Sequence, residues 1–187
     1  MSYELKSDGK FKYAEIGEGR VIIILHGLMG GLSNFDGVIK KFSQIDYKLV
    51  LPELPVYTQS LINTNVKSFA KYLKEFIDYK DYKDVILVGN SLGGHIGLYY
   101  TKNNLDRVAG IVLAGSSGLY ESAMGSGYTK RSDYNVMKAK VEEVFYDPAI
   151  ATKEIVDDVY ATVNDRSKLV KTIAIAKSAI RHNMAND

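Results

Sequence analysis

The pentapeptide Gly89-Asn90-Ser91-Leu92-Gly93 decides how this sequence is interpreted. It follows the apolar run Val85-Ile86-Leu87-Val88 and leads into a helix-like stretch that begins Gly94-His95-Ile96. We therefore expect a strand, then a turn tight enough to need small residues around a serine, and then a helix. Such a turn lifts the hydroxyl out of the sheet at a helix N-terminus, where backbone N–H groups and the helix dipole favour an anionic intermediate. Ser91 is thus a candidate nucleophile.

Other interpretations of this turn are a purely structural junction and a phosphate-binding loop. A Walker loop needs a lysine after the second glycine, and this chain has Gly94 there. A dinucleotide-binding fingerprint needs its glycines after the first strand and an acidic residue at the end of the next, which is not the pattern here. The nucleophile interpretation is therefore favoured.

Composition restricts the class of protein. A chain of 187 residues suffices for one domain, and 46% hydrophobic with 25% charged residues is typical of a globular protein. The net charge of +2 is spread along the chain, so no basic face indicates a nucleic-acid partner. The absence of cysteine excludes disulfides, a thiol nucleophile and a cysteine metal site. No residue spacing in the sequence predicts a metal site of another kind or a site for a cofactor. With no signal peptide and no apolar run of about 18 residues, we expect a cytoplasmic protein without a membrane span.

Apolar patterns predict a parallel sheet layered with helices. A hairpin is expected first, with strands at 3–7 and 11–16 joined by Asp8-Gly9. Buried strands and helices then alternate, which is the pattern of an α/β fold. The strands are expected at 20–25, 48–51, 85–88 and 108–114, and the helices at 66–77 and 92–103.

The residue composition of the chain changes at about residue 119. Residues 120–187 are polar, charged and helix-prone, and no strand-like run follows Ala114. We predict a core over residues 1–118 and a helical cap or lid over residues 119–187, lying above the edge of the sheet where ligands bind.

A second motif follows the strand at 20–25, where the chain continues as His26-Gly27-Leu28-Met29-Gly30-Gly31. Glycines at this point allow a sharp turn and leave backbone N–H groups facing a cavity. Together with the later serine turn, the sequence resembles the α/β-hydrolase superfamily. It is most similar to the lid-bearing serine hydrolase and esterase branch, with its H-G-x-x-G and G-N-S-x-G-G signatures.

This resemblance implies an activity and a site. Ser91 corresponds to the nucleophile, and the backbone N–H groups of Leu28 and Leu92 correspond to the oxyanion hole. The implied reaction is hydrolysis of a small ester or related carbonyl substrate through an acyl-enzyme, without a cofactor. Carbon–carbon hydrolases of ring-cleavage products have a similar sequence around the serine, and hydrolysis of a carbon–carbon bond is the alternative reaction. The supporting motif residues are His26, Gly27, Gly89, Asn90 and Gly93, of which Asn90 either reaches the substrate or caps local backbone.

The sequence departs from the family pattern in its acid and base. The pattern places an Asp or Glu after a later strand and a His after the last one. Here only His26, His95 and His182 occur, and we expect His26 to hold its loop and His95 to pack beneath the site. The pair Asp165 and His182 has the right chain order but lies in cap-like sequence.

We therefore expect the N-terminal part of a longer hydrolase, lacking the last strands of the sheet and without an identifiable acid or base. A catalytically incomplete scaffold used for binding is the non-enzymatic alternative. The strand at 108–114 would then end the sheet with an exposed apolar edge, which favours self-association.

Overall fold

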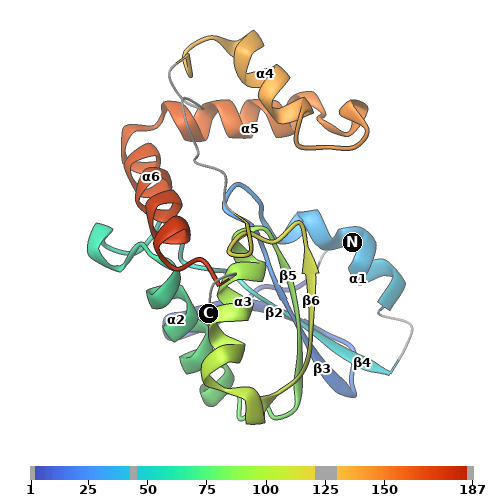
Figure 1. Ribbon diagram of the computed structural model, residues 1–187. Helices are drawn as coiled ribbons and strands as arrows, with labels where there is room; N and C mark the ends of the chain where they lie inside the picture. Colours follow the sequence, from blue (N-terminus) through green and yellow to red (C-terminus); the bar gives the residue numbers. More distant parts are fainter. Residues whose placement is uncertain (1–2, 43–45, 121–129, 185–187) are drawn as a thin grey trace.

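A single six-stranded sheet organises the chain (Figure 1). The computed structural model describes residues 3–42, 46–120 and 130–184. The strands are β1 (Lys6–Asp8), β2 (Phe11–Ile16), β3 (Arg20–Leu25), β4 (Tyr47–Pro52), β5 (Val85–Asn90) and β6 (Val108–Ala114). Their order is β1-β2-β4-β3-β5-β6, with β4, β3, β5 and β6 mutually parallel and β1 and β2 antiparallel to their neighbours. The expected mostly parallel α/β fold is confirmed.

The N-terminal hairpin differs slightly from its prediction. Asp8 pairs with Phe11, so the two turn residues are Gly9 and Lys10 rather than Asp8 and Gly9. Gly9 has a φ of +58°, which suits a tight hairpin turn. Strand β1 is also shorter than the predicted 3–7.

Helices cover both faces of the sheet. α2 (Val66–Tyr79) and α3 (Leu92–Asn103) lie on one face and the short α1 (Asp36–Phe42) lies on the other. The buried run of β3 serves both faces, because alternate side chains point to opposite sides of a strand. Ile23 and Leu25 belong to the larger core under α2 and α3, while Ile22 and Ile24 belong to the core under α1.

The C-terminal residues are helical, as expected from their sequence. α4 (Tyr134–Glu142) and α5 (Lys153–Asn164) share a small apolar cluster that contains Val141, Ala151 and Val156. In Figure 1 these two helices lie beyond the carboxyl ends of the parallel strands, while α6 (Arg166–Arg181) descends beside the main body. The short 3-10 helices are η1 (Leu32–Phe35), η2 (Leu61–Asn63), η3 (Leu105–Arg107) and η4 (Pro148–Ile150).

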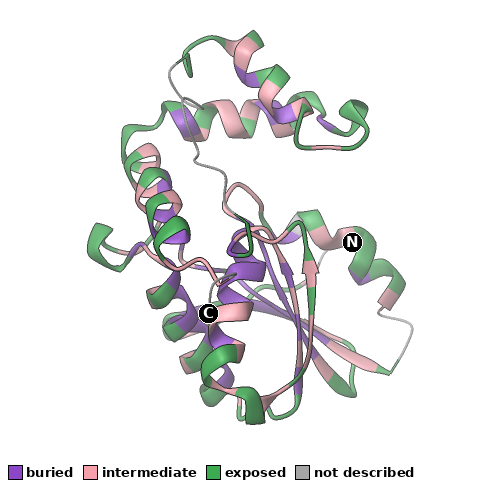
Figure 2. Ribbon diagram, viewed as in Figure 1, coloured by how far each residue is buried: buried purple, intermediate pink, exposed green. Residues whose placement is uncertain are grey.

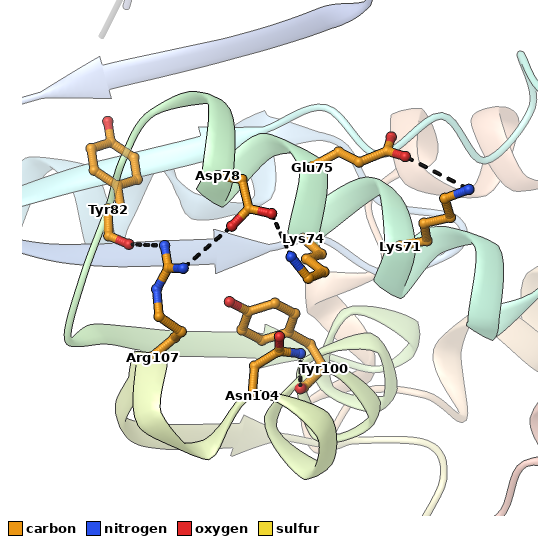
Figure 3. A network of polar contacts seen from close by, with 8 residues as sticks. All are labelled: Lys71, Lys74, Glu75, Asp78, Tyr82, Tyr100, Asn104 and Arg107. Atoms are coloured by element: carbon orange, nitrogen blue, oxygen red, sulfur yellow. Dashed lines mark hydrogen bonds and ion pairs between the residues drawn. The ribbon is translucent and has the colours of Figure 1, made fainter.

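A polar network ties together the opposite end of the sheet (Figure 3). The Arg107 guanidinium donates to the Tyr82 carbonyl at 2.8 Å and lies 3.4 Å from the Asp78 carboxylate. The same carboxylate accepts from Lys74 at 2.5 Å. These contacts join the end of α2, the start of β5 and η3, so they stabilise the end of the fold remote from Ser91.

Strand β6 forms one edge of the sheet and is poorly covered (Figure 2). Each of its residues is half-buried or exposed, and Val112 is 52% exposed. Within the described part of the chain, none of the helices is long and apolar enough to cross a membrane.

Candidate active site

Ser91 lies at the junction of β5 and α3 in an unusual backbone conformation. Its φ of +50° and ψ of −117° place it in a region that residues with a side chain rarely adopt. Three backbone hydrogen bonds hold it there. The Ser91 N–H donates to Ala114 at 3.2 Å, and its carbonyl accepts from Ser117 at 3.2 Å and His95 at 3.3 Å. Backbone strain of this kind persists only where surrounding structure enforces it, and it concentrates at functional sites.

The glycines around Ser91 are required by close packing. A Cβ atom on Gly93 would lie 2.2 Å from the Leu25 carbonyl oxygen. A Cβ atom on Gly89 would lie 2.4 Å from the Gly94 backbone. The expected need for small residues on both sides of the serine is therefore confirmed. The physical cause is contact of the turn with the end of β3 and the first turn of α3.

The loop after β3 lies against Ser91. Strands β3 and β5 are parallel neighbours with Leu25 opposite Gly89, so the residues that follow both strands meet at one edge. A Cβ built on Gly27 would lie 3.3 Å from Ser91 Cβ and 3.0 Å from Asn90 Oδ1. The structure therefore brings together the two motifs singled out in the sequence.

His26 is held by backbone groups on both sides of its ring. The Leu54 N–H donates to Nε2 at 2.9 Å, so Nδ1 carries the proton and donates to the Gly27 carbonyl at 2.8 Å. His26 is buried, and burial lowers the pKa of its imidazole, which favours this neutral form. With both nitrogens engaged, His26 joins its own loop to the segment after β4.

The two predicted oxyanion donors are the backbone N–H groups of Leu92 and Leu28. Leu92 is the first residue of α3, where backbone N–H groups have no partner within the helix. Leu28 follows Gly27 and packs against the larger core. The side-chain N–H of Asn90 donates to the Ala114 carbonyl at 3.0 Å, so this side chain binds nearby backbone.

His95 is completely buried one helical turn after Ser91. Its Nε2 donates to the carbonyl of His182 at 2.8 Å, and its ring packs against Gly118. His95 thus connects α3 to the end of α6 beneath the serine, which agrees with the packing role expected for it.

Asp165 and His182 do not form a catalytic pair. Asp165 caps the start of α6, where its carboxylate accepts from the Lys168 N–H at 2.9 Å. His182 caps the other end, with its ring edge-on to Tyr99. The 16 residues of α6 separate them by about 24 Å. Among the described residues, no hydrogen bond joins an imidazole to the Ser91 hydroxyl.

The segment after β6 is part of the site and was missed in the sequence. The Ala114 carbonyl accepts from Ser91 and Asn90, and the Ser117 N–H donates to the Ser91 carbonyl. No local motif marks this segment. The available signal was topological, because β6 is the parallel neighbour of β5 and both end at the same edge.

In the described part of the chain, acidic and histidine side chains do not gather into a metal site. In residues 3–42, 46–120 and 130–184 no group of three or more of them could hold an ion.

Comparison with known proteins identifies the family. The family model described as alpha/beta hydrolase fold matches residues 20–159, which include both motifs. The chain belongs to this family. The solved α/β hydrolase MGS-MChE2, from a sediment metagenome of the Mar Chica lagoon in Morocco, is 54% identical to it. That similarity covers 98% of this chain and 69% of the other, with a TM-score of 0.77.

Curated relatives are more distant and longer. A 2-hydroxy-6-oxononadienedioate/2-hydroxy-6-oxononatrienedioate hydrolase of Escherichia coli is 26% identical over 90% of this chain and 58% of its own length. The acetyltransferase component of an acetoin cleaving system of Pseudomonas putida is 26% identical over 75% of this chain and 39% of its own. The chain thus spans between two fifths and three fifths of the length of these relatives.

Proposed function

We propose that this chain carries the nucleophile and oxyanion hole of a serine hydrolase. The observation that best supports this proposal is the positive φ of Ser91, which lies between a parallel strand and a helix and beside the loop at Gly27. This arrangement is the strand–turn–helix setting that distinguishes a nucleophilic serine from a chance match to G-x-S-x-G. Family membership supports a hydrolase, and the serine supports covalent catalysis.

The proposed reaction begins with attack of Ser91 Oγ on a substrate carbonyl carbon. Negative charge then develops on the carbonyl oxygen, where the N–H groups of Leu28 and Leu92 donate to it. Removal of one such donor costs about 3 kcal/mol of transition-state stabilisation in other hydrolases. Collapse of the intermediate expels the leaving group and forms an acyl-enzyme, which water hydrolyses. A base must take the proton of the Ser91 hydroxyl and pass it to the leaving group, and we propose that this base is none of His26, His95 and His182.

We propose a small ester or related carbonyl compound as the substrate, held between a core at residues 1–118 and a cap at residues 119–187. The contacts of α4 and α5 with their own apolar cluster support this division for those two helices, whereas α6 packs against the larger core through Ile175. Hydrolysis of a carbon–carbon bond in a ring-cleavage product is the second candidate. It is favoured by the 26% identity to the Escherichia coli hydrolase named above.

Labelling by a fluorophosphonate tests the nucleophile. We expect a full-length protein that supplies the base to be labelled and its Ser91→Ala variant to lose at least about 99% of labelling, because only an activated serine reacts. Ser167→Ala is the matched control, since Ser167 is an exposed serine at the start of α6, and it should retain labelling. Absence of Ser91-dependent labelling in a folded full-length protein would contradict the proposal.

Turnover separates the candidate reactions. Ser91-dependent cleavage of a short-chain aryl ester supports the esterase, and preferential cleavage of a dienol-type ring-cleavage product supports the carbon–carbon hydrolase. Neither labelling nor turnover of either compound would indicate the catalytically incomplete binding scaffold. We further propose a cytoplasmic location.

A further inference from the structure

A groove between α6 and the loop before α2 lies outside the proposed catalytic site. It has a volume of about 380 Å³. One wall is formed by Leu61 and Ile62 of η2, and the other by α6 residues that include Lys177 and Arg181. Lys67 of α2 also lines it. In Figure 1 the loop that carries η2 projects from the body beside α6.

The walls of the groove are fixed to each other. The Val66 N–H at the start of α2 donates to Ser178 Oγ of α6 at 3.0 Å. Lys171 of α6 donates to the Tyr57 carbonyl at 2.7 Å, in the segment that leads to η2. Ile175 of α6 is 2% exposed and belongs to the larger core. The groove is therefore a built part of the fold.

The groove carries an excess of positive charge. Lys67, Lys177 and Arg181 line it, and no carboxylate does so among the described residues. Lys177 and Arg181 are four residues apart on one helix, a spacing at which like charges repel. Lys67 lies in the first turn of α2, which contains no acidic residue and where the helix dipole disfavours a cation. The helix dipole favours Arg181 in the last turn of α6, but a bound anion would relieve the repulsion between the cations and the unfavourable position of Lys67.

Exposed aliphatic side chains lie next to these cations. Ile62 is 88% exposed and Leu61 is 51% exposed at the projecting tip of η2. Ile173 and Ile180, 39% and 48% exposed, are seven residues apart on α6 and therefore share a face on either side of Lys177. Clustered exposed apolar residues with charged neighbours indicate an interaction surface.

We propose that this surface, formed by Leu61, Ile62, Lys67, Ile173, Lys177, Ile180 and Arg181, docks on a membrane surface of anionic lipids. The aliphatic side chains enter the boundary between headgroups and acyl chains, and the three cations contact lipid phosphates. A soluble phosphate would match the cations and leave the four exposed aliphatic residues without a role. The proposal requires no chemistry at Ser91.

Vesicle sedimentation tests the proposal with the purified protein. We expect binding to vesicles of phosphatidylglycerol, weaker binding as salt screens the charges, and little binding to phosphatidylcholine. Each cation near an anionic surface contributes about fivefold to binding. The triple variant Lys67→Gln, Lys177→Gln and Arg181→Gln should therefore bind about 100-fold more weakly, and Ile62→Ser should weaken binding at every salt concentration.

The control variant removes the same charge elsewhere, through Lys12→Gln, Lys41→Gln and Lys130→Gln, which are exposed positions. Circular dichroism verifies that each variant is folded. The proposal is overturned if the native protein ignores phosphatidylglycerol vesicles, or if both triple variants lose binding equally. Binding of inorganic phosphate without vesicle binding would also overturn it and assign a soluble-anion site. Since the readout is sedimentation, its outcome is independent of fluorophosphonate labelling at Ser91.

Discussion

At the scale of single residues, the packing around Ser91 explains why the turn tolerates so little variation. The carbonyl of Leu25 occupies the space that any side chain at position 93 would need. Backbone atoms cannot move aside without shifting β3, which carries the loop at Gly27 on its end. The residues of the turn are therefore determined by contact with a neighbouring strand.

Replacement of Gly93 by alanine should destabilise the protein severely. A Cβ 2.2 Å from a backbone oxygen cannot be accommodated without displacement of β3 or α3. We expect Gly93→Ala to lower the free energy of unfolding by roughly 3 kcal/mol or more, in the upper range for single substitutions. Urea unfolding followed by circular dichroism measures the change.

Gly97→Ala is the matched control in the same helix. Its Cβ would meet the terminal atom of a flexible side chain, Ile111, at 3.3 Å, and alanine favours the helix over glycine by about 1 kcal/mol. We expect a change in unfolding free energy within about 1 kcal/mol. Equal destabilisation by both substitutions would show that backbone contact at Gly93 is not the cause.

The parts of the site that depend on neighbouring residues in the sequence could be predicted, and those that depend on distant residues could not. The turn around Ser91 and the loop at Gly27 are local patterns that follow strands, so their residues were recognisable in the sequence. The hydrogen bond from His95 to His182 joins residues far apart in the chain, and no local pattern encodes it. The segment after β6 was missed for the same reason.

At the scale of elements, a charged cluster joins the N-terminal hairpin to α2 and β5. The Glu15 carboxylate on β2 accepts from Lys6 at 2.9 Å and from Lys80 at 2.9 Å, and it also accepts from the Tyr82 hydroxyl. Burial alone would raise the pKa of Glu15. The hydrogen bonds from Tyr82, Lys6 and Lys80 outweigh burial and lower the pKa to about 2.

The Glu15 cluster should make stability sensitive to acid. Because the pKa of Glu15 is about 2 in the folded chain and 4.5 ordinarily, its contribution is complete above pH 4.5 and is lost as pH falls towards 2. We expect Glu15→Gln to lower the unfolding free energy at pH 7 by about 1 to 3 kcal/mol. Its stability should also fall less steeply between pH 4.5 and 2. Denaturant unfolding across this range measures both, and an unchanged acid slope would refute the assignment.

Elements with strong periodicity were predictable and short ones were not. The spacing of Phe69, Leu73 and Phe76 indicated α2, which extends only two residues beyond its expected end. By contrast α1 has seven residues, includes a glycine and buries only Ile39, so its pattern is too short to distinguish from a loop. Its position is determined by packing against the second core.

At the scale of the whole molecule, the exposed edge at β6 should promote self-association. Val112 is 52% exposed on a strand whose outer edge has no neighbour among the described residues. We expect larger species to accumulate with concentration in size-exclusion chromatography with light scattering. Val112→Lys should raise the dissociation constant roughly tenfold or more, because it removes an apolar contact and introduces repulsion between charges.

The control for Val112→Lys is Val144→Lys, which makes the same change at a position that is 78% exposed near the end of α4. It should leave association unchanged. A native protein that is monomeric at every concentration tested would contradict this prediction.

The contact between Gly118 and Met184 has an evolutionary consequence. The Gly118 carbonyl accepts from the Met184 N–H at 2.6 Å, so the chain returns from its helical excursion to the point where it left the sheet. Segments with adjacent ends can be exchanged, lengthened or shortened with little effect on the structure that holds them. Ancestral shuffling of this excursion could therefore diversify the compounds that reach Ser91, while the strands beneath it stayed the same.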